Sequence, residues 1–182
     1  MLNLKTVPDL FPLPRIDDLI DSIPRGCSRY SISDVTDAFF TCQIAPEYRF
    51  KTAFKTHDRQ LQFSVLPQGF INSPGIFCRM IQETFEGMDR TKFSAYVDDL
   101  LNHADEFGDH FNIQQEIYSR LRTRSLTIKL TKTHLNYPSV KFLGHILCGD
   151  GRLPDPESVE AIAAWKNPET AKEVRSFLGA TL

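Results

Sequence analysis

The sequence lacks the cysteine patterns of zinc sites and of disulfide frameworks. Its 182 residues include four cysteines, and no two of them form a C-x-x-C pair. Scattered cysteines without that spacing are typical of buried free thiols. With 41% hydrophobic residues, the chain can instead bury one sizeable core, so we expect one domain plus an appendage. The four thiols are Cys27, Cys42, Cys78 and Cys148.

Membrane segments and the common nucleotide-binding motifs are also missing. Residues 1–13 contain one lysine and are interrupted by Pro8 and Pro12, which fits neither a signal peptide nor a membrane span. We therefore expect an intracellular protein without membrane partners. The chain has no glycine-rich P-loop or Rossmann motif and no Ser/His/Asp spacing, which argues against those nucleotide-binding folds and against a triad hydrolase.

Acidic residues are absent from one long stretch, although the net charge is −2. Residues 1–110 carry 11 basic and 16 acidic side chains, whereas residues 111–182 carry 10 and 7. Between Ile117 and Gly149 every charged residue is basic. A basic stripe beside an acidic site would suit a phosphate-backbone ligand, although a solvated helix face explains such a run equally well. The six cations are Arg120, Arg122, Arg124, Lys129, Lys132 and Lys141.

Two adjacent carboxylates, Asp98 and Asp99, interrupt an apolar stretch between Tyr96-Val97 and Leu100-Leu101. This arrangement predicts a tight hairpin that presents both aspartates at its tip. Close carboxylates repel each other unless a cation lies between them or solvent screens them. The pattern therefore indicates either a metal site or ordinary turn chemistry.

Periodicity predicts an α+β fold, with an antiparallel sheet, helices on one face and a ferredoxin-like split β-α-β order. Ser73 and Pro74 are expected to be the N-cap and the first residue of a long helix. Asp155 and a Thr170 to Glu173 capping box are expected to start two later helices. Helices are expected over 13–23, 73–85 and 107–121, and strands over 30–35, 50–56, 61–66, 93–97, 100–103, 126–130 and 140–147.

Asp34 is a third candidate, because it stands near the end of a predicted strand. If this strand and the Asp98-Asp99 hairpin lie side by side, three carboxylates meet in one site. Hard oxygen ligands of this kind suit Mg²⁺ or Mn²⁺. Taken alone, each aspartate is more simply explained as a turn residue.

Five motifs, in one order, give the chain a resemblance to a known family. Residues 30–40 contain Asp34 followed five positions later by Phe39, residues 66–74 begin Leu-Pro-Gln-Gly, and residues 96–99 read Tyr-Val-Asp-Asp. Lys132 and the stretch 142–145, Phe-Leu-Gly-His, complete the set. The chain resembles reverse transcriptases of retroviruses and of long-terminal-repeat retrotransposons, and residues 13–17 and 153–179 are similar to gypsy-type elements in particular.

The resemblance implies RNA-directed DNA polymerisation by two-metal nucleotidyl transfer from a deoxynucleotide to a primer 3′-hydroxyl. Asp34, Asp98 and Asp99 would be catalytic and, with the carbonyl of Val35, would bind two Mg²⁺ ions, with Mn²⁺ as an alternative. RNA or DNA template, primer and deoxynucleotide would be the partners. The expected locations are the cytoplasm or a virus-like particle, or the nucleus.

The same resemblance implies how the nucleotide is bound. Backbone amides of Asp37 and Ala38 would contact the triphosphate. The ring of Phe39 would leave no room for a ribose 2′-hydroxyl, and Gln68 would contact the sugar and base of the nascent pair. Lys132 would protonate pyrophosphate or hold a phosphate. Core packing, turn chemistry and solvent exposure are the alternative explanations for Phe39, Gln68 and Lys132 respectively.

A division of the chain also follows from the resemblance. Residues 1–29 would lead in from the fingers, 30–148 would form the palm with fingers strands inserted at about 45–75, and 149–182 would begin the thumb. The fingers hairpin, the remaining thumb and the RNase H domain of a polyprotein would lie outside this chain. The primer grip is assigned to Phe142, Leu143, Gly144 and His145.

Two other functions stay open. The chain could be a decayed or domesticated remnant that binds nucleic acid or protein without chemistry. It could also be a metal-dependent nuclease or phosphatase that uses the same carboxylates, for which His103 is the one candidate base close in sequence to Asp98 and Asp99.

Overall fold

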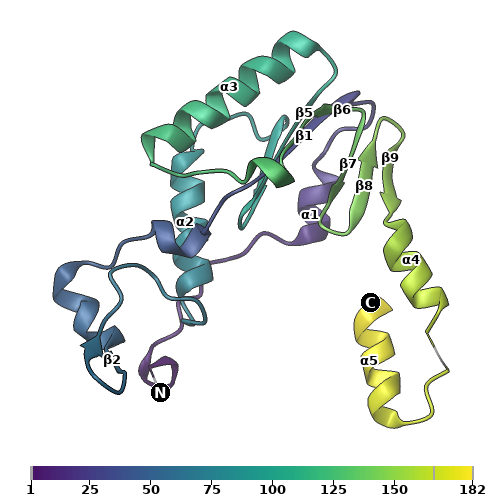
Figure 1. Cartoon of the computed structure of the whole chain (residues 1–182). Helices are drawn as coiled ribbons and strands as arrows, with labels where there is room; N and C mark the ends of the chain where they lie inside the picture. Colours follow the sequence, from purple (N-terminus) through teal and green to yellow (C-terminus); the bar gives the residue numbers. More distant parts are fainter. Residues whose placement is uncertain (1, 166, 182) are drawn as a thin grey trace.

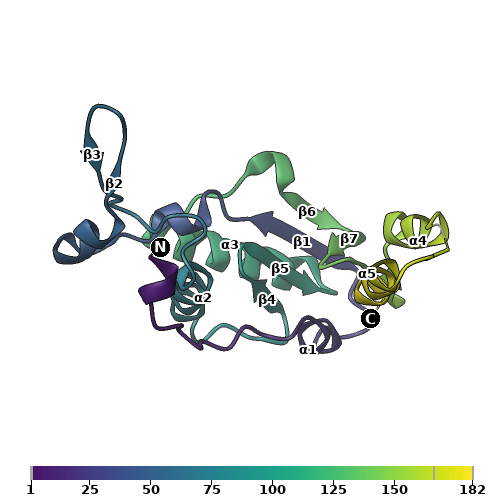
Figure 2. The same ribbon diagram turned by 90° about the horizontal axis from the view of Figure 1, so that it is seen from below.

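A four-stranded antiparallel sheet forms the centre of the computed structural model, which describes residues 2–165 and 167–181. The strands lie in the order β4-β5-β1-β6, so that β1 and β5 are the two inner strands (Figures 1 and 2). This arrangement confirms the predicted α+β class with antiparallel strands. The bounds are β1 (Arg29–Asp34), β4 (Phe93–Tyr96), β5 (Asp99–Ala104) and β6 (His134–Tyr137).

The two long helices, α2 (Ser73–Thr84) and α3 (Phe107–Thr123), cover one face of this sheet. Side chains alternate along a strand, so every second residue of β4 and β5 points to these helices. The resulting core is aromatic and aliphatic, which explains the helical spacing of the apolar residues in both segments. Its most buried members include Phe77, Phe85, Phe93, Leu100 and Ile117.

A second core lies on the opposite face, where α1 (Ile16–Asp21) and a three-stranded sheet pack. That sheet contains β7 (Ser139–Phe142), β8 (His145–Cys148) and β9 (Gly151–Pro154). The prediction of helices on one face therefore holds for the long helices, whereas the short α1 is on the other face. The buried members of this core are Ile20, Cys27, Tyr30, Leu101, Val140, Phe142 and Leu147.

The first turn of α2 differs from the prediction by one residue. Asn72, not Ser73, is the N-cap, and its side chain makes no capping hydrogen bond. Ser73 is the first helical residue, and its hydroxyl donates instead to the carbonyl of Pro67 at 3.0 Å. The hydroxyl therefore links the helix to the preceding loop, a contact that the capping preference of serine does not predict.

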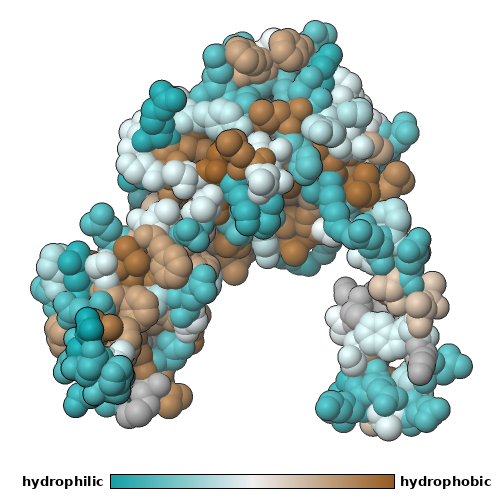
Figure 3. All heavy atoms as spheres, viewed as in Figure 1, coloured by the Kyte–Doolittle hydropathy of each residue, from teal (hydrophilic) through white to brown (hydrophobic). Residues whose placement is uncertain are grey.

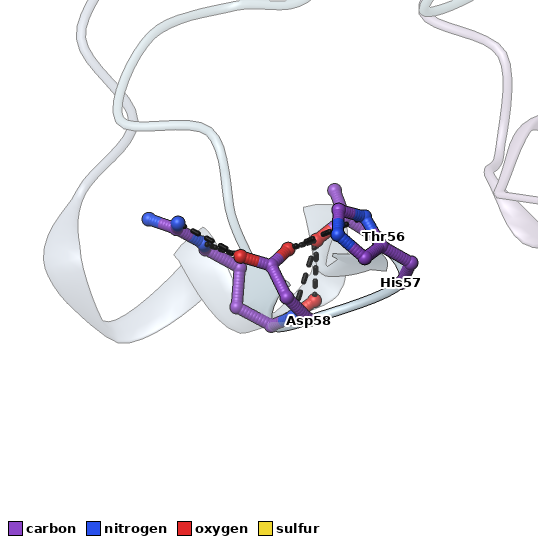
Figure 4. Close-up of polar contacts among 4 residues, drawn as sticks. Thr56, His57 and Asp58 are labelled. Carbon is purple, nitrogen blue, oxygen red and sulfur yellow. Dashed lines mark hydrogen bonds and ion pairs between the residues drawn. The ribbon is translucent and has the colours of Figure 1, made fainter.

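Between residues 45 and 70 the predicted strands are largely wrong. The expected strand 50–56 begins inside the 3₁₀ helix η3 (Pro46–Thr52), the paired strands β2 (Phe54–Lys55) and β3 (Gln60–Leu61) have two residues each, and Val65 forms a single bridge with Gln43. The tip of this hairpin is closed by local polar contacts among Thr56, Asp58 and Arg59, with Thr56 Oγ1 donating to Asp58 Oδ1 at 2.7 Å (Figure 4). These side chains are exposed, so no core imposes a longer strand pairing.

The segment after α3 also departs from the prediction. Residues 126–130 form no strand except one bridge between Ile128 and Val35, and they lead into η4 (Leu130–Lys132). The edge strand β6 was not predicted: it is only four residues long, and its polar–apolar alternation is not matched by burial, because all four residues are exposed. The stretch 140–147 is not one strand but the hairpin of β7 and β8, which turns at Leu143 and Gly144.

The two C-terminal helices are capped as the sequence predicts. Asp155 accepts a hydrogen bond from the backbone of Glu157 at the start of α4 (Pro156–Ala163). Thr170 and Glu173 make both bonds of a capping box at the start of α5 (Ala171–Thr181). Figures 1 and 3 show these helices and the lobe around β2 projecting from the same side of the central body, with open space between the two projections.

Other described elements are short. The 3₁₀ turns η1 (Asn3–Lys5) and η2 (Ala38–Thr41) precede α1 and follow β1 respectively. Of the four cysteines, Cys27, Cys42 and Cys78 are buried free thiols as predicted, and Cys148 is half-buried. No helix within the described ranges has the length and apolar character needed to cross a bilayer.

Candidate active site

The pairing of β1 with β5 brings two of the three predicted carboxylates, Asp34 and Asp99, together. Asp34, the last residue of β1, lies directly opposite Asp99, the first residue of β5. Residues directly opposite each other on neighbouring strands point to the same face. Both aspartates therefore project from the face that also carries Ile32 and Leu101, away from α2 and α3.

The third carboxylate, Asp98, occupies the turn between β4 and β5. Tyr96 pairs with Asp99, so Val97 and Asp98 alone form a two-residue turn. The hairpin prediction is thus confirmed, but only Asp98 lies at its tip, because Asp99 already belongs to the strand. The backbone N–H of Val35 donates to the Asp98 carbonyl at 2.8 Å, which fixes the turn beside the end of β1.

Val97 adopts an uncommon backbone conformation. Its φ is +51°, a region that β-branched residues rarely occupy. The hydrogen bond from the Val35 N–H to the carbonyl of the next residue, Asp98, holds the turn in this conformation. Such local strain persists only where the surrounding structure imposes it, and here it directs Asp98 toward Asp34 and Asp99.

The carboxylates interact electrostatically. Burial, then the charges of Asp98 and Asp34, raise the pKa of Asp99 to about 6. The Lys132 ammonium forms an ion pair with Asp34 at 2.8 Å, and this contact raises the pKa of Lys132. The two partners are 98 positions apart in the sequence, so tertiary structure alone places Lys132 in the site.

Three carboxylates from two strand ends and a turn provide suitable oxygen ligands for a hard divalent cation. Within residues 2–165 and 167–181, however, no three His, Cys, Asp or Glu side chains form a ready-made metal site. Asp34 is paired with Lys132 instead, and three uncompensated carboxylates repel one another. Burial is the first cause of the raised pKa of Asp99, and the charges of Asp98 and Asp34, which a bound cation would neutralise, add to it.

A cleft of about 320 Å³ adjoins the carboxylates and contains most of the predicted nucleotide-binding residues. Asp37 begins the turn η2 with a left-handed φ of +50°, which changes the chain direction directly after Val35. Ala38 and Phe39, which follow, line the cleft together with Asp34. The lining comprises Asp34, Val35, Thr36, Asp37, Ala38, Phe39, Gln68, Val97, Asp98, Lys129 and Lys132.

Phe39 and Gln68 reach the cleft by different means. The ring of Phe39 is half-buried and packs edge to face on Phe77 of α2, with centroids 5.9 Å apart. Gln68 is exposed on the loop before α2. Phe39 thus packs against the core, as the alternative explanation expects, and its side chain also lines the cleft.

A second, larger cleft of about 810 Å³ lies on the other side of Asp34 and Lys132. It extends from Asp34 and Asp99 past β6 to the turn of the β7–β8 hairpin, where Leu143 and Gly144 line it. Phe142 does not line the cleft but is buried in the second core, and His145 bonds the Leu143 carbonyl at 3.2 Å. The predicted primer-grip residues therefore divide into two that face the cleft and two that support the turn.

The six cations between residues 117 and 149 do not form one surface. Arg120 pairs with Glu116 and donates to the carbonyls of Thr84 and Glu86, so it joins α3 to the end of α2. Lys141 pairs with Asp155 and Glu157. The prediction of one basic stripe is therefore wrong in geometry: Lys129 and Lys132 line the smaller cleft and Lys132 and Lys141 line the larger one, whereas Arg120 and Arg122 lie on α3, which covers the opposite face of the sheet.

Several residues of the site could not be identified from the sequence. Lys129 lines the smaller cleft, and His134 and Tyr137 line the larger one. Each comes from a loop or edge strand with no local motif. Only the pairing of β1 with residues 127–137 brings them to the carboxylates.

The family model described as "Reverse transcriptase (RNA-dependent DNA polymerase)" matches residues 2–147. This match covers both strand ends, the turn and the loop that build the site. The chain belongs to the reverse transcriptase family. Members of this family are nucleotidyltransferases and generally use divalent metal ions.

Relatives of this reverse transcriptase chain include retrotransposon polyproteins. The Pol polyprotein from transposon opus of Drosophila melanogaster is 32% identical over 181 residues, and that from transposon 297 of the same organism is 29% identical over 180. Each alignment covers 99% of this chain. The chain spans only 17–18% of the length of these polyproteins.

Solved structures of foamy viral protease-reverse transcriptase are similar as well. One in complex with dsDNA has a TM-score of 0.87 and 27% sequence identity, covering 98% of this chain and 37% of that one. Another, in complex with RNA/DNA hybrid, has a TM-score of 0.83 at 27% identity, covering 97% of this chain and 24% of that one. The shared fold thus extends over nearly the whole chain.

Proposed function

We propose that this chain is the palm, with part of the fingers and the first thumb helices, of an RNA-directed DNA polymerase. One observation carries the proposal: Asp34 lies opposite Asp99 with Asp98 in the adjoining turn, at the junction of two clefts. Nucleotide addition needs this topology, because a nucleotide and a primer end must reach one set of carboxylates from two sides. The proposed boundaries are residues 1–29, 30–148 with an insertion at about 45–75, and 149–182.

The smaller cleft is the proposed deoxynucleotide site. The backbone of Asp37 and Ala38 offers amides to the triphosphate where the chain reverses after β1. Phe39 is held by Phe77 and excludes a 2′-hydroxyl by its bulk. Gln68 contacts the sugar and base of the incoming nucleotide from the opposite wall.

The larger cleft is the proposed path of the primer 3′ end. Leu143 and Gly144 at the turn of the β7–β8 hairpin form its far wall, and Phe142 and His145 hold that turn in place. The hairpin is rigid at this point because Phe142 is 1% exposed and belongs to the second core. A primer strand resting on it is thereby directed at Asp34 and Asp99.

Asp34, Asp98 and Asp99, with the carbonyl of Val35, would hold two divalent cations, Mg²⁺ or Mn²⁺. Bound there, the ions supply activation of the primer 3′-hydroxyl and neutralisation of the charge on the leaving pyrophosphate. Lys132 holds the Asp34 carboxylate in the free chain and is within reach of the phosphates in the nucleotide cleft. There it binds a phosphate or donates a proton to pyrophosphate.

The proposed partners are an RNA or DNA template with its primer, a deoxynucleotide, and the domains that the relatives' polyproteins add to this region. Nucleic-acid affinity grows with the number of phosphate contacts, so the affinity of this chain alone is limited to the contacts that its own surfaces offer. The proposal places the protein inside the cell, in the cytoplasm, a virus-like particle or the nucleus.

Primer extension on an RNA template tests the proposal. With Mg²⁺ and deoxynucleotides, the Asp98→Asn variant should lose activity by a factor on the order of 1,000 or more, because it removes a carboxylate from the reacting centre. Asparagine suits turns as well as aspartate does, so the hairpin should still fold. The matched control is Asp150→Asn, which changes an exposed residue in the turn between β8 and β9.

The outcomes separate the remaining functions. Activity that survives Asp98→Asn would sink the assignment of the site. Binding of nucleic acid that weakens with salt, without product at any enzyme concentration, would indicate the non-catalytic remnant. Cleavage of labelled RNA without primer extension would indicate a nuclease on the same carboxylates.

A further inference from the structure

The loop that carries Gln68 is a β-turn with little support of its own. Phe70 N–H donates to the Pro67 carbonyl, and Gly69 has a φ of +79°, the geometry of a type II turn with Gln68 at its second position. A Cβ added at Gly69 would meet nothing within 4 Å, so the turn projects into open space. Within the described ranges, no hydrogen bond is formed by the Gln68 side chain.

Asn3, 66 residues away in the sequence, holds this turn from outside. Its side-chain Nδ2 donates to the Gly69 carbonyl at 2.8 Å, and its Oδ1 accepts from the Ile71 N–H at 3.1 Å. One carboxamide therefore satisfies the backbone on both sides of Phe70. Asn3 itself is fixed in the turn η1, where the Thr6 N–H donates to its carbonyl.

A reciprocal pair joins the same two segments in the opposite direction. The Asn72 side chain accepts from the Asp9 N–H and donates to the Val7 carbonyl, both at 3.0 Å. Asp9 then pairs with Arg79 of α2 at 2.9 Å. Two carboxamides thus lock the segment 3–9, called here the N-terminal strap, to the loop 67–72.

We propose that Asn3 and Asn72 are positioning residues for the incoming nucleotide, because they orient the turn that presents Gln68 to the smaller cleft. The inference rests on the proposed function, since it assumes that Gln68 contacts a deoxynucleotide there. Neither residue touches the cleft, and both act through the backbone of residues 69–72. The strap therefore belongs to the nucleotide site although it lies far from the carboxylates in sequence.

Steady-state primer extension by the full chain tests the inference. Asn3→Ala should raise the KM for deoxynucleotide about tenfold while kcat changes less than threefold, because the reacting carboxylates are untouched. Asn3→Asp keeps an acceptor for the Ile71 N–H but loses the donor to Gly69, and should give an intermediate KM. Asn112→Ala, an exposed asparagine of α3, is the matched control and should change neither constant.

Hydrogen exchange provides a readout that does not depend on turnover. The Ile71 amide should exchange at least tenfold faster in Asn3→Ala, and the amide of Asp9 should do so in Asn72→Ala. Faster exchange together with a raised KM supports the positioning role.

Failure of the inference is distinct from failure of the proposed function. Wild-type extension combined with an unchanged KM in both Asn3→Ala and Asn72→Ala overturns the inference alone. Unchanged exchange of the Ile71 amide in Asn3→Ala also overturns it, since the clamp would not exist in solution. A wild-type chain that neither extends a primer nor binds a deoxynucleotide overturns the proposed function and the inference with it.

Discussion

Phe39 combines a packing contact with a position in the wall of the smaller cleft. Its ring packs edge to face on Phe77, and its side chain borders the smaller cleft, the proposed nucleotide site. Phe39→Val should therefore reduce the preference for deoxynucleotides over ribonucleotides by roughly 10- to 100-fold, because the smaller side chain leaves room for a 2′-hydroxyl. Competition between the two nucleotide types in primer extension measures this change.

The neighbouring phenylalanine provides the control. Phe40 is 40% exposed and does not line the cleft. Phe40→Val removes the same volume one position away and should leave the selectivity unchanged. Equal selectivity in the wild type and Phe39→Val would show that Phe39 is only a core residue.

His103 allows a prediction of pH-dependent stability. It is 1% exposed in β5, and burial, followed by the effect of His110, lowers its pKa to about 4. Below the ordinary value of 6.5, the unfolded chain binds a proton that the folded chain does not. The free energy of unfolding should therefore fall by up to about 1.4 kcal/mol per pH unit between pH 6.5 and 4 through this residue.

Denaturant unfolding of the wild type and of two histidine variants at several pH values checks this prediction. His103→Gln should lose this part of the acid sensitivity. His57→Gln should keep it, because the His57 side chain is 94% exposed and is solvated in the folded and unfolded chain alike. Parallel stability curves for the wild type and His103→Gln between pH 6.5 and 5 would contradict the assignment.

At the scale of elements, the β7–β8 hairpin depends on its turn. Leu143 and Gly144 have φ values of +48° and +79°, as a type I′ turn requires at both central positions. Gly144→Ala should destabilise the chain by about 1–2 kcal/mol, because its Cβ would meet no neighbour within 4 Å and the cost is purely conformational. Urea unfolding measures the change.

Gly108 in α3 offers the opposite sign with the same substitution. Its added Cβ would also meet nothing within 4 Å, but its backbone is helical. Gly108→Ala should therefore stabilise the chain by up to about 1 kcal/mol. A loss of stability in Gly108→Ala comparable to that in Gly144→Ala would mean that packing, not backbone conformation, determines both effects.

Elements with one buried face were predictable, and exposed elements were not. The apolar spacing of α2 and α3 and the alternation in β1 reflect contact with the two cores, so periodicity located them. β6 is fully exposed, and η3, β2 and β3 in the region 45–70 contribute no buried residue to either core, although Leu66 belongs to the first one. Their pairing depends on neighbours such as Tyr30 and Thr52, which local patterns do not identify.

At the scale of the molecule, charge distribution matters more than net charge. Lys129 lines the smaller cleft, the proposed nucleotide site, whereas Arg122 lies on α3, which covers the opposite face of the sheet. For binding of a primer–template with its complementary deoxynucleotide, a plot of the logarithm of the association constant against the logarithm of the salt concentration gives a slope. Lys129→Gln should reduce this slope by about 0.9. Fluorescence anisotropy across a salt series, with Ca²⁺ to prevent turnover, measures this slope.

Arg122→Gln removes the same charge from the other face and should leave that slope unchanged. A reduced slope for Arg122→Gln with none for Lys129→Gln would place the nucleic acid on the helical face. That result would contradict the proposed arrangement of the two clefts.

The sequence by itself determined the identity of the chemical groups. The Tyr-Val-Asp-Asp stretch, the motif around Asp34 and the Leu-Pro-Gln-Gly loop are each local, and their order indicated the family and the α+β class. The helix caps at Asp155 and Thr170 were equally local, because capping depends on residues within one turn.

Only the tertiary structure decided how these groups meet. The register that places Asp34 opposite Asp99, the ion pair with Lys132, the division of the basic residues between two faces and the strap held by Asn3 all join residues far apart in the chain. Such contacts follow from strand register and from burial of two cores on opposite faces of one sheet. No local pattern encodes them, because each depends on how distant segments pack.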